Sequence, residues 1–150
     1  MSVKIKRKNP DAISDVYKRM KSFGDKEVAV GFPAGKSQAY PDGTGVATVA
    51  AYHVYGIGVP RRDFMGLALS DIKRHTKEIM KQASRASDER TQLALMETAG
   101  EIAKRDIQKA IVDLDDPPND PKTIKAKGSS NPLIDTSHML QSVTYIVRDK

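Results

Sequence analysis

The chain contains no cysteine and no tryptophan, and only 5% of its 150 residues are aromatic. The lack of cysteine excludes disulfide bonds and thiolate metal ligands. No apolar run approaches the length needed to cross a bilayer, and the opening stretch MSVKIKRK lacks the apolar region of a secretory signal peptide. We therefore expect a soluble protein that is made in the cytoplasm and has no membrane partner.

The composition predicts one domain over residues 1–150 with a modest core and long polar loops. Hydrophobic residues make up 39% of the chain and charged residues 29%, which is respectively low and slightly high for a globular protein. The net charge of +6 and the isoelectric point of about 9.5 favour contact with a polyanion or an acidic protein. A small basic nucleic-acid-binding protein is therefore one function to consider.

Two strands and two long helices form the predicted framework. Strands are expected at residues 26–32 and 143–147, which are rich in valine and β-branched residues. Helical spacing of apolar residues runs from Phe64 to about residue 84, and again to residue 114 after a cap at Ser87. The predicted fold class is α+β, a small antiparallel sheet packed against two long antiparallel helices, with long extended loops. Gly100 lies inside the second helix, which predicts close packing against that point.

The N-terminal segment adds an expected strand and a helix. Residues 3–5 alternate apolar side chains with lysine, which indicates an edge strand or a basic arm. Asn9 and Pro10 are the expected N-cap and first residue of a helix. The apolar residues of this helix share one face: Ile13, Val16, Tyr17 and Met20.

The most informative stretch is VATVAAYHVYGIGVPRRDFMGLAL, residues 46–69. A short helix at residues 46–55 ends at Gly56, which suits the left-handed residue that often follows a helix. Asp63 is the expected N-cap of the next helix. The segment at residues 55–64, here called the elbow, is expected to insert Phe64 into the core and to leave Arg61 and Arg62 at an exposed rim.

A second informative segment, residues 115–131, is here called the arm. Its sequence DDPPNDPKTIKAKGSSN offers almost nothing to a core. Such a segment is typical of a loop that becomes ordered on a partner. After it, Asp135 is expected to cap a short helix that directs Met139 and Leu140 inward.

The elbow and the arm carry a resemblance to one family, the neck and tail-completion (virion morphogenesis) proteins of tailed bacteriophages. In the run YHVYGIGVPRRDF the matching residues are Tyr52, His53, Tyr55, Gly56, Gly58, Pro60, Arg62 and Phe64. In the C-terminal segment they are Pro117, Pro118, Asn119, Thr123, Ile124, Lys127, Gly128, Ser129, Pro132, Leu133, Ile134, Asp135, Thr136, Leu140, Ser142 and Val143.

The resemblance implies a structural protein of the virion, assembled in the host cytoplasm. The implied role is a ring, for which a hexamer is one candidate, at the neck or head-proximal tail end. Such a ring joins tail to head around the channel through which genomic DNA passes without sequence-specific binding. The implied partners are further copies and neighbouring neck, connector and tail proteins. The residues expected at these interfaces are Tyr55, Arg61, Arg62, Phe64, Pro117, Pro118, Asn119, Lys122, Lys125 and Lys127.

No set of residues predicts catalysis, a metal site or a cofactor. The loop GFPAGKS at residues 31–37 has three residues where a phosphate-binding loop needs four. The three histidines have no metal-ligand spacing, and the acidic residues at 113–120 lack the pattern of a calcium loop. Asp135, Ser137 and His138 are too close in sequence for a nucleophile relay, which is assembled in space. We therefore expect no enzyme and no cofactor.

Overall fold

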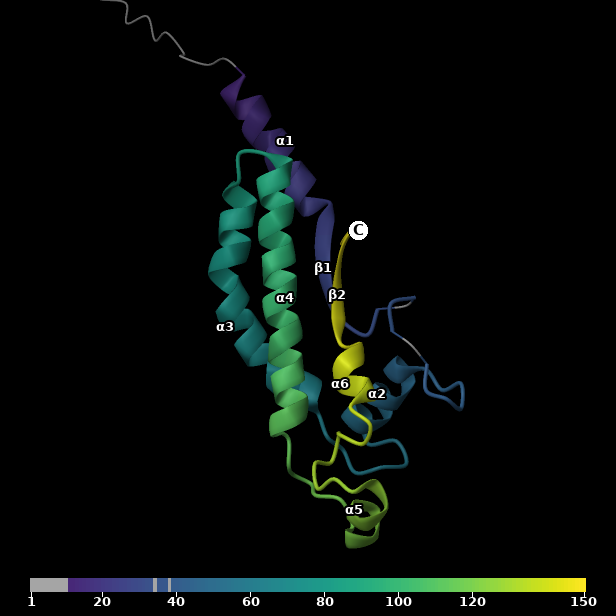
Figure 1. Cartoon of the computed structure of the whole chain (residues 1–150). Coiled ribbons are helices and arrows are strands. Elements are labelled where there is room, and N and C mark those ends of the chain that lie inside the picture. Colours follow the sequence, from purple (N-terminus) through teal and green to yellow (C-terminus); the bar gives the residue numbers. More distant parts are fainter. Residues whose placement is uncertain (1–10, 34, 38) are drawn as a thin grey trace, which may run out of the picture.

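The computed structural model describes residues 11–33, 35–37 and 39–150, so the predicted strand at residues 3–5 and the Asn9–Pro10 helix start lie outside the described residues. Figure 1 shows the arrangement of the helices and strands. In chain order they are α1 (Ala12–Gly24), β1 (Lys26–Gly31), α2 (Val46–Tyr55), α3 (Phe64–Arg85), α4 (Glu89–Asp113), α5 (Pro121–Lys127), α6 (His138–Ser142) and β2 (Thr144–Asp149).

The two long helices and the sheet form successive layers, which confirms the predicted α+β class. In Figure 1, α3 and α4 run antiparallel, and α4 lies between α3 and the two strands. The helix starts follow capping chemistry. Asp63 accepts a hydrogen bond from the Gly66 amide at 2.8 Å, as predicted. Asp88 caps α4 by accepting from the Thr91 amide at 2.8 Å, so the prediction of Ser87 as the cap is one residue early.

The sheet joins the two ends of the described chain. β1 and β2 are antiparallel, in a register that runs from Lys26 opposite Asp149 to Gly31 opposite Thr144. The charged ends of the strands form ion pairs. Lys26 contacts Asp149 at 3.0 Å, and Arg148 contacts Glu27 at 2.7 Å. Because these pairs are at least partly exposed, they contribute more to the choice of register than to stability.

The core follows one side of α4 and continues into the end of the molecule that carries the elbow. Leu69 was expected in the apolar stripe of α3, but it is exposed. The completely or nearly completely buried apolar residues are Val46, Ala50, Phe64, Ala68, Ala83, Met96, Ala99, Ala103, Ile107, Ile111, Leu114, Leu133, Met139 and Val143.

Helix α1 projects beyond the end of the α3–α4 pair in Figure 1. Its apolar residues share one face, as the sequence predicts, but that face is not part of the core. The side chains of Ile13, Val16, Tyr17 and Met20 are all exposed. Amphipathic spacing therefore identified the helix correctly, while nothing in the described chain covers its apolar face.

Gly100 allows β2 to approach α4 closely. A Cβ atom at this position would lie 2.3 Å from Cδ2 of Tyr145 and 2.7 Å from its Cγ. The close packing that the glycine predicts is therefore present, against the strand rather than against another helix. Among the described residues no helix is both long and apolar enough to span a membrane.

We predict that Gly100→Ala destabilises the protein because the new methyl group overlaps the Tyr145 ring. Overpacking of this kind costs about 1–3 kcal/mol, against which the helix gains up to about 1 kcal/mol from alanine. Urea unfolding should show a net loss of stability. In a Tyr145→Val background the same glycine substitution should become neutral or stabilising. An equal loss in both backgrounds would contradict the assigned contact.

Candidate functional site at the junction of the elbow and the arm

The elbow is a tight connection closed by its own backbone. Gly56 follows α2 with a φ of 71°, in the left-handed region, and the Ile57 amide donates to the Tyr52 carbonyl at 2.9 Å. A Cβ at Gly56 would lie 3.1 Å from Cβ of Arg61, so the chain folds back closely on itself there. The Arg62 amide then donates to the His53 carbonyl at 2.7 Å. These bonds fix the direction in which the Arg62 side chain leaves the backbone.

The Arg62 side chain connects the elbow to the arm. Its Nε donates to the Pro117 carbonyl at 2.9 Å, and its Nη2 donates to the Pro118 carbonyl at 3.2 Å and to Asn119 Oδ1 at 3.1 Å. The residue is only 4% exposed, and burial lowers the pKa of its guanidinium. The prediction that Arg62 lies at an exposed rim is therefore wrong, because its side chain is occupied in holding the arm.

The arm is folded on its own chain. Asn119 Nδ2 donates to the Asn131 carbonyl at 3.4 Å and so joins the two ends of the arm to each other. Asn131 Nδ2 donates to the Val112 carbonyl at 2.8 Å and ties the arm to α4. Asp120 caps α5 by accepting from the Lys122 amide at 2.8 Å. None of the arm's residues is fully buried, as the sequence predicts, yet hydrogen bonds hold it to its own chain without a partner. Proline-containing turns and asparagine side chains fix it without a core.

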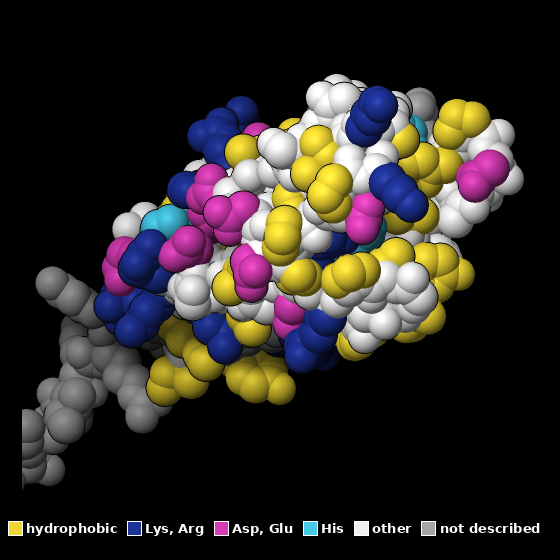
Figure 2. Space-filling model, turned by 90° about the horizontal axis from the view of Figure 1, so that it is seen from below, with side chains coloured by type: hydrophobic (Ala, Val, Ile, Leu, Met, Phe, Trp, Pro, Cys, Tyr) yellow, Lys and Arg dark blue, Asp and Glu magenta, His cyan; other side chains and the backbone are white. Residues whose placement is uncertain are grey.

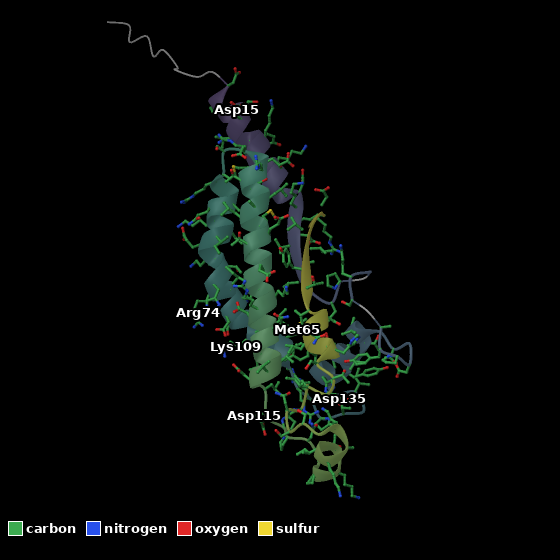
Figure 3. The ribbon with its side chains drawn as sticks, viewed as in Figure 1. Asp15, Met65, Arg74, Lys109, Asp115 and Asp135 are labelled. Carbon is green, nitrogen blue, oxygen red and sulfur yellow. The ribbon has the colours of Figure 1, made fainter. Side chains whose placement is uncertain are left out.

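Elbow, arm and the loop around Tyr40 line a cavity of about 610 Å³ that is open to solvent. Both signs of charge line it, including Arg62, Lys127, Asp120 and Asp135. Figure 3 labels Asp115 and Asp135, which lie at this same end of the molecule. The wall of this cavity is therefore polar and of mixed charge.

The positive groups around the cavity lower one another's affinity for protons. Burial lowers the pKa of the Lys127 ammonium, Asp135 opposes this shift, and Arg62 adds to it. Burial, Arg62 and Lys127 all lower the pKa of His53. The Nδ1 atom of His53 is buried, and no hydrogen-bond partner lies within the described part of the chain. Burial and the nearby carboxylates of Asp135 and Asp42 raise the pKa of Tyr40.

In the short run at residues 135–138, His138 packs against Tyr40, with ring centroids 4.7 Å apart and ring planes tilted by 58°. The expected cap at Asp135 is wrong, since α6 begins at His138 after Ser137, whose φ is 59°. Met139 is buried and Leu140 half-buried, as predicted. Within the described residues, no group of three or more metal-ligating side chains is present.

The expected interface residues divide into three groups by burial. Phe64 is fully buried and Arg62 nearly so, which leaves neither available to a partner on this fold. Pro117, Asn119 and Lys127 are half-buried around the Arg62 contact. The exposed members of the set are Tyr55, Arg61, Pro118, Lys122 and Lys125.

Helix α5 is the element of this site that sequence reasoning missed. Asp120 followed by Pro121 is a typical helix start, and Gly128, with a φ of 69°, is a typical helix end. The seven residues between them bury no side chain completely, so apolar spacing gave no signal. Capping residues alone could have identified the helix.

Comparison of the chain with protein-family models, curated proteins and solved structures gave no match to any of them.

We predict that Arg62→Lys loosens the arm. One ammonium cannot reach all three acceptors of the guanidinium, and each hydrogen bond from a charged donor contributes roughly 1.5–3 kcal/mol. Amide hydrogen exchange should accelerate across residues 119–131, and stability should fall by about 2 kcal/mol. Arg61→Lys is the matched control, because the exposed Arg61 side chain contacts the Val54 carbonyl and Asp63 rather than the arm, so exchange across residues 119–131 should stay unchanged. Unchanged exchange in the Arg62 variant would contradict the contact.

We also predict that His53 makes the protein less stable in acid. Its folded-state pKa lies below the ordinary value of 6.5, so below about pH 6.5 the unfolded chain binds the proton first. The stability contributed by neutral His53 is present above that pH and is lost as pH falls toward the folded pKa. Imidazole resonances followed by NMR, with His53→Gln to assign the signal, should show this lowered pKa. Titration of His53 at or above 6.5 would contradict the prediction.

Proposed function

We propose that this chain is a structural, non-enzymatic protein of a tailed-phage virion. It forms a ring at the neck or head-proximal end of the tail and joins tail to head around the DNA channel. The observation that carries the proposal is the Arg62 contact. The elbow and the arm each resemble the neck and tail-completion family, and they are more than fifty residues apart in the chain. One buried guanidinium brings them together.

The surface at the arm end supports contact with proteins rather than a groove for nucleic acid. Figure 2 looks onto this end and shows basic, acidic and apolar side chains interspersed, without one continuous basic area. A nucleic-acid-binding surface typically presents clustered lysine and arginine. The exposed apolar residues near the elbow are Tyr52, Tyr55 and Ile57, and exposed apolar side chains at a polar rim are typical of protein interfaces. Neighbouring neck, connector and tail proteins are the proposed partners.

The test is electron microscopy of lysates from a phage that carries a deletion of the gene for this chain. We expect DNA-filled heads and unattached tails in separate particles, because the joint between them is missing. Expression of the intact chain from a plasmid should restore joined virions and serves as the control. Normal virions in the deletion lysate would overturn the proposal, and salt-sensitive binding of the purified chain to duplex DNA would then favour the nucleic-acid-binding alternative.

A further inference from the structure

Among the described residues the sheet has two strands, and neither of its outer edges pairs with a third strand. One face packs against α4, while β2 lies uncovered in the view of Figure 1. Two strands alone are marginally stable in water. An open edge also presents backbone groups that are ready to pair with another strand.

The hydrogen-bond pattern identifies which backbone groups point outward. The Lys150 amide donates to the Asp25 carbonyl at 2.8 Å, and these residues are opposite one another in the register. Antiparallel pairs alternate between bonded and non-bonded types. The Asp25–Lys150 pair is therefore of the bonded type, and the adjacent Lys26–Asp149 pair is of the non-bonded type. In each non-bonded pair the backbone amides and carbonyls point away from the ladder, and such pairs recur at every second residue. These residues are Lys26, Val28 and Val30 on β1, and Tyr145, Val147 and Asp149 on β2.

No other part of the described chain satisfies these outward groups. Outside the β1–β2 ladder, no backbone hydrogen bond to these six residues is found among the described residues. Each edge is therefore a row of donors and acceptors at every second residue, and the two rows have the same spacing. A strand from another molecule would satisfy them.

The order of charges on the two edges favours a second copy of this chain. β1 begins with Lys26 and Glu27, and β2 ends with Arg148 and Asp149, so an antiparallel β1–β2 pair places opposite charges together. The same pairing between two copies repeats this complementarity. Antiparallel pairing of two β1 strands would instead place Lys26 and Glu27 opposite uncharged residues, and parallel pairing would oppose like charges.

We propose that the β1 edge of one copy pairs antiparallel with the β2 edge of the next, so that the sheet continues from copy to copy. Strand direction then alternates throughout, which is compatible with cyclic symmetry because every copy has the same orientation along the axis. Closing the ring pairs every edge. The inference rests on the proposed function for the ring itself and names the surface on which that ring is built.

Cysteine cross-linking tests this arrangement cleanly, because the natural chain has no cysteine. Two differently tagged full-length chains are co-expressed, one carrying Ala29→Cys and the other Ile146→Cys. Both positions lie on the sheet face away from α4, since Tyr145 faces Gly100 and side chains alternate along a strand. In the proposed ladder they form a non-hydrogen-bonded pair between copies, with Cα atoms about 4.5 Å apart, which is within disulfide range.

Under a copper–phenanthroline oxidant we expect a disulfide-linked dimer that contains both tags, and at most trace dimers from either variant alone. Ile146→Cys co-expressed with Lys77→Cys, on the exposed surface of α3, is the matched control and should give no mixed dimer. A second pair, Glu27→Cys with Arg148→Cys, covers the case in which the first pair disturbs folding. Absence of both mixed dimers, or equal linkage to the Lys77 variant, would overturn the proposal, as would efficient self-linkage of one variant.

The outcome is separable from that of the proposed function. Native mass spectrometry that shows rings without a mixed disulfide would overturn the edge pairing and leave the head-to-tail joining role unaffected. Normal virions in the deletion lysate would remove that role, while a mixed disulfide would still support the pairing between copies.

Discussion

A buried guanidinium with three neutral acceptors holds one end of this molecule together. Removing the charge of Arg62 from water is costly, and the acceptors that its guanidinium meets among the described residues are two backbone carbonyls and an amide oxygen rather than a carboxylate. The cost is offset only while Pro117, Pro118 and Asn119 all present their oxygens. The arm depends on Arg62 because it has few apolar contacts of its own. Arg62 depends on the arm because its guanidinium has few other acceptors. Elbow and arm therefore keep their shapes together.

The other end of the molecule is held by conventional packing. Helix α4 contacts α3 on one side and the sheet on the other, and its buried residues are mostly small or aliphatic. Gly100 brings the Tyr145 ring against the helix backbone. A thin sheet gains most of its stability from such a support, because two strands have no stable form of their own in water.

The sequence was sufficient to predict the elements whose formation depends on periodicity or on a cap. The two long helices, both strands and the Asp63 cap follow from local patterns, and they are present. Some errors are local, because the caps at Ser87 and Asp135 were misassigned and α5 was missed despite its typical capping residues. The other errors fall where the outcome depends on tertiary contacts. Arginine is usually exposed, so the pair Arg61–Arg62 gave no reason to expect that one side chain would be buried and the other would not. The same reason explains α1, whose apolar spacing predicts a helix but cannot show whether anything covers it.

The arm was predicted to become ordered on a partner because its composition offers no core. Its attachment depends on polar side chains, and their partners lie far away in sequence. The bond from Asn119 to Asn131 closes the arm at its base, so the separation of its two ends does not depend on what lies between them. Lengthening a closed surface loop costs little, because loop-closure entropy grows only slowly with length. The arm can therefore accept insertions while the body of the protein stays unchanged, which would let one scaffold adapt to different neighbours.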